Sequence, residues 1–304
     1  MPTARQAWLF LKLSRPHFLV GGFLLYGLGA AIASYLGKPV DVGLYVLGQA
    51  LVTLIHLMTH YLNEYYDASG DRENPNRTPL SGGSGALAPD GLPRSVALYA
   101  GILSLGLAAA VASAALVSRA LPPLAWIILA LSFLGAYFYS APPLRLVSTG
   151  YGEIDAAVVV AGLLPSFGFV VQTGEIHRLL VMSTTPLMSL GFAMLLVFQI
   201  PDYASDLKYA KRTFAVRLGW QAAFRAHDLA VVFALFSLMI AYVNGLPPRV
   251  ALGALIAAPL GLAQIWQMRR IRIGFPPRWT TLTVSALALF ALTAYLELAG
   301  YLLS

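Results

Sequence analysis

The segments Asn63-Glu-Tyr-Tyr-Asp67-Ala-Ser-Gly-Asp71 and Asp202-Tyr-Ala-Ser-Asp206 have the same spacing of acidic residues, and each follows a long apolar run. Asp202 lies 135 residues after Asp67, and both segments continue as D-x3-D-x5-R-T, ending at Arg77-Thr78 and Arg212-Thr213. A spacing of four places two carboxylates on one face of a helix. Carboxylates beside membrane segments are usually functional. The repeated pattern therefore predicts one site for divalent metal and phosphate, built from two halves of the chain.

The composition is that of a polytopic membrane protein. Of 304 residues, 58% are hydrophobic and only 11% are charged, and the mean hydropathy is +0.72. A soluble domain has about 25% charged residues. Apolar runs near the length of a membrane span predict an all-α fold with nine transmembrane helices. They are expected at about 17–36, 43–62, 95–117, 122–140, 155–173, 179–200, 226–244, 250–267 and 280–301.

The distribution of basic residues predicts the orientation. With the N-terminus in the cytoplasm, sixteen of the 20 Lys and Arg residues fall in inside segments. Only Lys38, Arg119, Arg178 and Arg249 fall outside. This bias follows the positive-inside rule and predicts a cytoplasmic site and an external C-terminus. It also explains the net charge of +7, so we expect no nucleic-acid partner. The absence of cysteine excludes disulfides, thiolate metal sites and a cysteine nucleophile.

The repeat predicts the organisation of the chain. The 135-residue offset brackets four spans, so spans one to four and five to eight are expected to form a duplicated unit, with a ninth helix appended. Parallel repeats of this kind place a site at their interface. Because neither half completes the site alone, we expect residues 1–304 to form a single domain.

The first motif predicts a stripe of metal ligands. His60, Asn63, Asp67 and Asp71 fall on one helix face, which is too polar for lipid and should line a cavity. Hard oxygen ligands without cysteine suit Mg2+ or Mn2+, and two aspartate pairs can hold two ions bridged by a diphosphate. The expected metal ligands are Asn63, Asp67, Asp71, Asp202 and Asp206. His56 and His60 are left out as cavity or packing residues, and Glu64, about 100° around the helix from Asn63, is a weaker ligand candidate. The alternative is a set of helix caps and solvated loop charges.

The second motif differs in its surroundings. Pro201 should disrupt the helix before Asp202. Phe198 occupies the position equivalent to Asn63, and the adjacent Gln199 is a possible substitute. Cationic side chains favour the departure of a diphosphate, so the following basic residues are candidate catalytic groups, although topology alone would also place them there. They are Lys208, Lys211 and Arg212.

Two further residues are expected at the same polar face. Arg145 follows Pro142-Pro143 after the fourth span, much as Arg15-Pro16 opens the first. Tyr139 can offer a hydroxyl or a ring face that stabilises a cation, or belong to an interfacial aromatic belt. No Walker loop, H-E-x-x-H or G-x-S-x-G motif occurs.

These motifs together resemble the UbiA superfamily of intramembrane prenyltransferases. The resemblance rests on Arg15-Pro16, the N-x3-D-x3-D of Asn63 to Asp71, Tyr139-Ser-Ala-Pro-Pro-Leu-Arg145, and Asp202 with Asp206. It implies nine helices around a central cavity that opens to the lipid. It also implies an isoprenyl diphosphate bound through Mg2+ on these aspartates, and prenyl transfer to an acceptor.

Within the superfamily, Ile200–Asp206 and Lys211–Gly219 are most similar to the 1,4-dihydroxy-2-naphthoate polyprenyltransferases of menaquinone synthesis. That similarity implies a hydrophobic aromatic acceptor and a prokaryotic cell membrane. The chain departs from the usual pattern at Glu64, where aspartate is common, and at Ala210, where glycine is usual. Thr78-Pro-Leu-Ser-Gly-Gly replaces the R-P ending of the 4-hydroxybenzoate and haem O enzymes, which argues against those acceptors.

Several alternatives stay open at this stage. The general base can be Glu153, Asp155, His60 or the departing diphosphate. The acceptor can be another lipid precursor, such as a geranylgeranylglyceryl phosphate. A transporter of cations or organic anions is the alternative from a different class, although transporter sites usually lie near the bilayer midplane rather than at helix ends.

Overall fold

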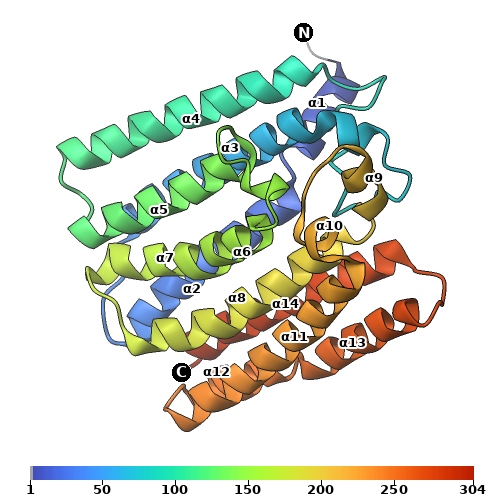
Figure 1. Ribbon diagram of the computed structural model, residues 1–304. Helices are drawn as coiled ribbons and strands as arrows, with labels where there is room; N and C mark the ends of the chain where they lie inside the picture. The colour runs from blue at the N-terminus through green and yellow to red at the C-terminus, as the bar shows by residue number, and fades with distance from the viewer. Residues whose placement is uncertain (1–2) are drawn as a thin grey trace.

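The computed structural model describes residues 3–304, which form helices joined by loops, with no strand among them (Figure 1). Nine helical spans in this range are long and apolar enough to cross a membrane, which confirms the predicted class. They are α2 (Pro16–Tyr35), α3 (Val42–Arg72), α4 (Arg94–Val117), α5 (Pro123–Ser140), α6 to α7 (Gly152–Thr173), α8 (Arg178–Gln199), α11 (Trp220–Val243), α12 to α13 (Pro248–Arg272) and α14 (Trp279–Leu302).

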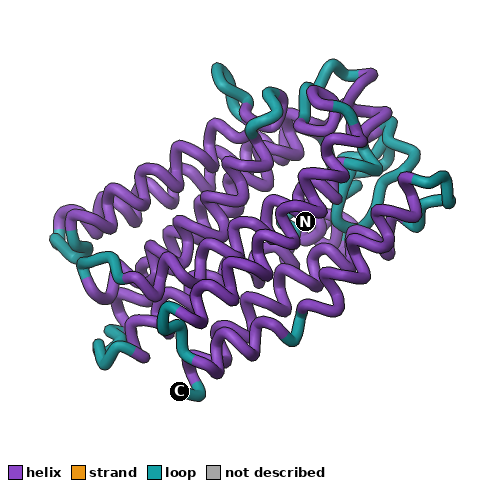
Figure 2. Tube along the Cα trace, turned by 60° about the horizontal axis from the view of Figure 1, so that its bottom comes forward, coloured by secondary structure: helices purple, strands orange, loops and turns teal. Residues whose placement is uncertain are grey.

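Short helices gather at one end of this bundle, which we call the site end. They are α1 (Ala4–Leu13), η1 (Leu146–Ser148), α9 (Tyr203–Lys208) and α10 (Phe214–Leu218). Figure 2 shows the loops collected at the two ends of nearly aligned helices, and Figure 1 places the C-terminus at the end opposite α9 and α10.

Some helix boundaries differ from those predicted from apolar runs, because a helix can continue through a polar segment and an apolar run can be divided. The second span was expected at 43–62, but α3 continues to Arg72, because its backbone hydrogen bonding persists through the polar motif. The fifth span divides into α6 (Gly152–Ala157), the π-helix η2 (Val158–Leu163) and α7 (Leu164–Thr173). The eighth divides into α12 (Pro248–Leu255) and α13 (Ala258–Arg272), where Pro259 cannot continue the hydrogen-bond ladder.

The packing supports the predicted duplication. Helix α3 packs along α4, and its counterpart α8 packs along α11, while α14 packs against α2, α8 and α12. At the site end, Ser205 Oγ donates a hydrogen bond of 2.9 Å to the carbonyl of Gly70, and Lys208 pairs with Glu73. The members of each pair are separated by 135 residues, the offset of the repeat. Equivalent residues meet each other when two units are related by a two-fold axis.

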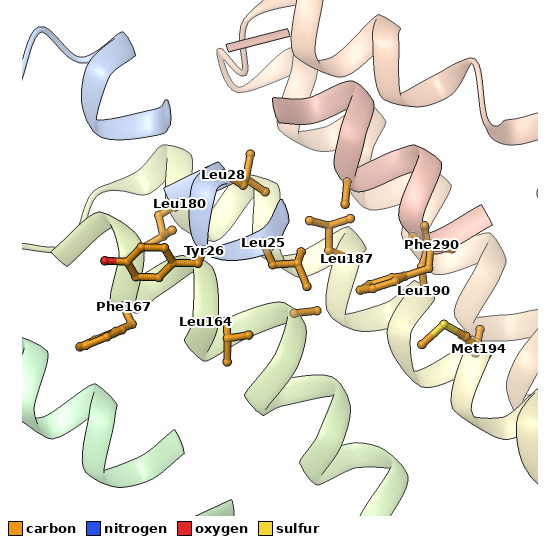
Figure 3. Packing of buried hydrophobic residues seen from close by; sticks show 14 of the residues in the cluster. Leu25, Tyr26, Leu28, Leu164, Phe167, Leu180, Leu187, Leu190, Met194 and Phe290 are labelled. Carbon is orange, nitrogen blue, oxygen red and sulfur yellow. The ribbon is translucent and has the colours of Figure 1, made fainter. Parts of the chain in front are cut away.

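Close backbone contact joins the two halves in the core. A Cβ atom added to Gly29 of α2 would lie 2.6 Å from the backbone nitrogen of Phe169 in α7, so only glycine fits. Small residues allow membrane helices to approach closely. Beside this contact the rings of Tyr26 and Phe167 lie 6.0 Å apart, and Figure 3 shows Leu187, Leu190 and Phe290 packed where α8 meets α14.

Candidate active site

The two aspartate motifs converge on one cavity at the site end. This main cavity has a volume of about 310 Å³. Its polar end is lined by Arg15, Asn63, Asp67, Asp71, Tyr139, Asp202, Asp206 and Lys211. The structure therefore brings together all five predicted metal ligands, although they come from segments 135 residues apart in the sequence.

The first motif lies on the last turns of α3. Asn63 Nδ2 donates hydrogen bonds to Asp67 Oδ2 at 2.9 Å and to Ser140 Oγ at 3.3 Å. The periodicity predicted one stripe, and Asn63, Asp67 and Asp71 do line the cavity together. The amide thus orients the Asp67 carboxylate from the turn before it, as a metal ligand set requires.

The second motif begins at a helix start instead of a helix end. Helix α8 ends at Gln199, Pro201 follows, and Asp202 is the N-cap of α9. The Asp206 backbone N–H donates to the Asp202 carbonyl at 2.8 Å, so both carboxylates stay on one side of α9. Asn74 was not predicted, yet its Nδ2 donates to Asp202 Oδ1 at 2.6 Å.

Lys211 lies between the two motifs. Its Nζ atom is 2.8 Å from Asp67 Oδ2 and 4.0 Å from Asp206 Oδ1. Although burial disfavours its charge, these carboxylates raise the pKa of Lys211 well above its ordinary value. The preceding Ala210 has a φ of +52°, a left-handed turn that directs Lys211 back toward the cavity. Lys211 is the predicted cation that the structure places among the aspartates.

The polar end of the cavity has an excess of negative charge. Four aspartates face Lys211, while the charge of Arg15 is already balanced by Glu64 through a hydrogen bond of 3.0 Å from Nε. Burial raises the pKa of Asp202 to about 7, and the adjacent Asp206 carboxylate adds to the shift. Burial likewise raises the pKa of Asp206 to about 6. An anion such as a diphosphate would be repelled here unless cations accompanied it.

The donor set fits Mg2+ that is shared with a phosphate ligand. Within residues 3–304, no three carboxylate or imidazole side chains form a complete metal cage. Mg2+ does not need one, because it typically takes one or two carboxylates and completes its shell with water and substrate oxygens. Two aspartate pairs with hard oxygen donors and uncompensated negative charge match that requirement.

A loop between α3 and α4 covers the site, and Glu64 holds it. Glu64 is 3% exposed, and its carboxylate accepts hydrogen bonds from the Ser84 backbone at 2.6 Å and the Ser84 hydroxyl at 2.9 Å. Gly83, with a φ of +77°, lies against Asp71, so that an added Cβ would be 2.8 Å from Asp71 Cγ. No sequence pattern points to Ser84, whereas a pair of glycines such as Gly82-Gly83 is typical of a tight loop.

Three of the predicted catalytic residues do not reach the main cavity. Lys208 is exposed and pairs with Glu73, and Arg212 is exposed on the loop between α9 and α10. Arg145 lies with its guanidinium 5.7 Å from the Tyr66 ring and is absent from the residues lining the cavity. The candidate substitute Gln199 does line the cavity, but its amide nitrogen donates to Glu153.

A second, smaller cavity of about 120 Å³ adjoins the main one between α3, α5 and η2. We call it the side chamber. His56, His60 and Tyr139 line both spaces, and Asp155 lines only the side chamber. His60 Nδ1 donates to the carbonyl of Ser14 at 3.0 Å, which leaves its other nitrogen free to accept.

The other end of the main cavity is apolar and runs between α2, α8 and α14. Its walls come from Val20, Leu24, Leu25, Met194, Leu195, Phe198, Leu287 and Phe290. A polar, acidic head space therefore continues into an apolar channel, which suits an amphiphile with a charged head and a hydrocarbon tail.

Comparison with known proteins finds one matching family and two relatives that cover most of the chain. A model of the UbiA prenyltransferase family matches residues 23–282. The 1,4-dihydroxy-2-naphthoate octaprenyltransferase of Bacillus subtilis (strain 168) is 25% identical over 235 residues, covering 76% of this chain and 70% of the relative. The lycopene elongase/hydratase of Haloferax volcanii is 29% identical over 257 residues, covering 81% of this chain and 78% of the relative.

Solved structures share the fold. The structure of a UbiA homologue from Archaeoglobus fulgidus bound to DMAPP and Mg2+ superposes with a TM-score of 0.61. The match covers 95% of this chain and 98% of that chain at 17% identity. At this identity the similarity concerns the arrangement of the helices.

Proposed function

Since this chain belongs to the UbiA prenyltransferase family, and is thus an integral membrane prenyltransferase, we propose that it transfers a prenyl group from an isoprenyl diphosphate to 1,4-dihydroxy-2-naphthoate. One observation carries the proposal: the two aspartate motifs meet at a single cavity that continues into an apolar channel. The head space suits a diphosphate with its cations, and the channel suits the prenyl chain.

We assign metal binding to Asn63, Asp67, Asp71, Asp202 and Asp206. Mg2+ bound there would neutralise the diphosphate and withdraw electron density from it as the bond to carbon breaks. Their convergence and the charge excess around them support the assignment. Asn63 and Asn74 orient carboxylates of the two motifs by hydrogen bonds, and so would keep the donor oxygens in place.

Lys211 is the cation best placed to act on the leaving group. Its ammonium stands between the motifs, where it would donate hydrogen bonds to the departing diphosphate oxygens. Arg15 faces the same space, but its pairing with Glu64 makes it a positioning residue in this proposal. Lys208, Arg212 and Arg145 are left out because they do not line the cavity.

The reaction itself needs a dry space and an electron-rich acceptor. The C–O bond of the allylic diphosphate breaks, and its electron pair leaves with the diphosphate. A ring carbon of the acceptor then supplies the electrons of the new C–C bond, and loss of CO2 from that carbon restores aromaticity. The apolar walls exclude water from the allylic cation, and the Tyr139 ring, at the junction of the two cavities, would stabilise it.

We place the aromatic acceptor in the side chamber. It adjoins the head space through Tyr139, and His56, His60 and Asp155 offer polar contacts to hydroxyl groups. Asp155 and His60 are the candidates for a base that takes a hydroxyl proton of the acceptor, because Glu153 is already engaged by Gln199 and the Phe214 backbone. The Bacillus relative supports a naphthoate acceptor.

We also propose that the site end faces the cytoplasm of a prokaryotic cell. The sixteen basic residues assigned to the inside lie in α1, in loops or at helix ends on this side of the bundle, in agreement with the positive-inside rule. Single cysteines at Arg225 and Arg249, introduced into this cysteine-free chain, should be labelled from the cytoplasmic and external sides respectively.

The test uses purified protein with Mg2+, a labelled isoprenyl diphosphate and 1,4-dihydroxy-2-naphthoate. The wild type should yield a prenylated, decarboxylated product, and Asp67→Asn and Asp202→Asn should each lower the rate about a hundredfold or more. Asp90→Asn, an exposed aspartate in the loop beside the site, is the matched control and should keep the wild-type rate. Diphosphate release without that product would reject the naphthoate but keep the metal site.

A further inference from the structure

A third cavity, of about 520 Å³, lies at the site end outside the main cavity. We call it the basic pocket, because Lys12, Arg15 and Arg77 line it and no acidic side chain in residues 3–304 does. Lys12 belongs to α1, and Arg77 belongs to the loop after α3. Positive-inside topology explains why such residues are at this end, but it does not explain why they converge on one cavity.

Two of these three basic side chains have no acidic partner among the residues that the structure describes. Arg15 is paired with the buried Glu64. Lys12 and Arg77 form no ion pair with any acidic side chain in the part of the chain that the structure describes. Arg77 is also the arginine of the first D-x3-D-x5-R-T motif, and it faces this pocket instead of the aspartates. The pocket is therefore electropositive beside a main cavity that is electronegative.

The same pocket has an apolar rim. Trp8 and Leu11 precede Lys12 on one stripe of α1, and they are 61% and 48% exposed. The opposite face of α1 is fixed to the bundle through Leu13 and through the Ser14 hydroxyl, which lies 2.7 Å from the Tyr61 hydroxyl. Helix α1 thus holds an exposed tryptophan before the first membrane span, and tryptophan is enriched where membrane spans meet the lipid head groups.

We propose that the basic pocket binds the phosphate head group of a membrane amphiphile, whose apolar chain lies along Trp8 and Leu11. Lysine and arginine are both phosphate-binding residues. Two sources share this chemistry: an anionic phospholipid of the surrounding leaflet, and an isoprenyl diphosphate held next to the main cavity. The inference goes beyond the proposed reaction, since it holds whichever acceptor the enzyme uses.

Trp8 is a built-in reporter for the test. Protein is reconstituted in phosphatidylcholine bilayers that contain a small share of either brominated phosphatidylglycerol or brominated phosphatidylcholine. The difference between wild type and Trp8→Phe isolates the quenching of Trp8. Each basic residue near an anionic lipid contributes about fivefold in affinity, so the phosphatidylglycerol lipid should be preferred by more than tenfold.

The variant Lys12→Gln/Arg77→Gln should lose this preference. Arg225→Gln/Arg269→Gln removes the same charge from exposed positions at the same end of the bundle and should keep it. A non-hydrolysable thio analogue of an isoprenyl diphosphate is then added in metal-free buffer, which keeps it from the aspartates. Relief of the quenching, or a shift of Trp8 emission, identifies an isoprenyl diphosphate as the ligand, and quenching that persists identifies a phospholipid.

Equal quenching by the two lipids together with no response to the analogue would overturn the proposal. A preference that survives Lys12→Gln/Arg77→Gln would overturn it as well. Neither result bears on product formation, so failure here is distinguishable from failure of the proposed function.

Discussion

Lys211 and Lys208 follow the same aspartate pair, but their surroundings differ. Lys211 lies 2.8 Å from Asp67 inside the cavity, while Lys208 is 65% exposed and pairs with Glu73 on the surface. Lys211→Gln should lower kcat/KM by about a hundredfold, because a charged donor to the leaving group is lost. Lys208→Gln should stay near the wild-type rate, since exposed pairs contribute little. Steady-state kinetics on the two variants checks both expectations, and equal losses would contradict the assignment of Lys211.

Glu64 is expected to stabilise the folded protein rather than to contact the substrate. Its carboxylate joins Arg15 to Ser84, so Glu64→Gln would leave Arg15 without a charge partner in a site where it is only 15% exposed. The free energy of unfolding of the variant should fall by about 3 kcal/mol, because loss of one partner of a buried ion pair leaves an uncompensated charge. Thermal unfolding in detergent measures this.

The matched control for that variant is Glu175→Gln. Glu175 pairs with Lys38 at an exposed position, where an ion pair adds little, so its unfolding temperature should not change. Proteolysis of the loop between α3 and α4 should also quicken in Glu64→Gln alone. If both variants unfold at the wild-type temperature, Glu64 does not anchor this loop.

At the residue scale, the cavity-lining side chains that could be predicted from the sequence are mainly those that occur in both copies of the repeated motif. Asp67 and Asp202 occupy equivalent positions in the two copies, so the presence of one strengthens the prediction of the other as a site residue. Asn74 and Ser84 have no such counterpart, and their roles depend on a loop whose path follows from tertiary contacts. Arg145 looked equivalent to Arg15 because each lies within two residues of a proline, but proximity to a proline does not determine which way a side chain points.

At the scale of elements, the turn between α9 and α10 determines where Lys211 points. Ala210 has a φ of +52°, and the Lys211 backbone N–H donates to the Asp206 carbonyl at 2.8 Å. A left-handed conformation costs a residue with a Cβ about 1 kcal/mol, and glycine adopts it freely. Ala210→Gly should therefore raise the stability by up to about 1 kcal/mol and keep the activity, as thermal unfolding and turnover would show.

Ala204→Gly provides the control for this prediction. Ala204 is exposed within α9, where glycine costs a helix about 0.5–1 kcal/mol. The two alanine-to-glycine changes should shift the unfolding temperature in opposite directions. A decrease for both would mean that the backbone at Ala210 is not left-handed.

Element types were easier to predict than element ends. Nine apolar runs were sufficient for nine spans, because a bilayer requires helices of fixed length. Hydropathy did not detect the mostly polar residues 63–72 as part of α3, because it reports the preference for lipid and not helicity. The π-helix η2 likewise leaves no apolar signature, since Val158–Leu163 are apolar in either helix type.

At the scale of the whole molecule, the candidate active site lies beside contacts between equivalent residues of the two halves, as expected near a local two-fold axis. Ser205 meets Gly70, its equivalent in the other half, and the aspartates of both motifs line one cavity. A site that needs both halves cannot form unless they stay in register. The 135-residue offset in the sequence therefore predicts which residues of the two halves are in contact, and cross-linking can test this prediction.

The chain contains no cysteine, so an introduced pair reports on this axis without interference. A Cβ added to Gly70 would lie 3.8 Å from Ser205 Oγ, close enough for a disulfide after a rotamer change. Gly70→Cys/Ser205→Cys should form that bond under mild oxidation and keep prenyl transfer, since neither residue lines the cavity. Gly70→Cys/Ala204→Cys, with its second thiol one position away on the exposed side of α9, should not. Mass spectrometry of proteolytic fragments detects the link, and its absence in the first pair, or equal yield in both, would refute the two-fold arrangement of the motifs.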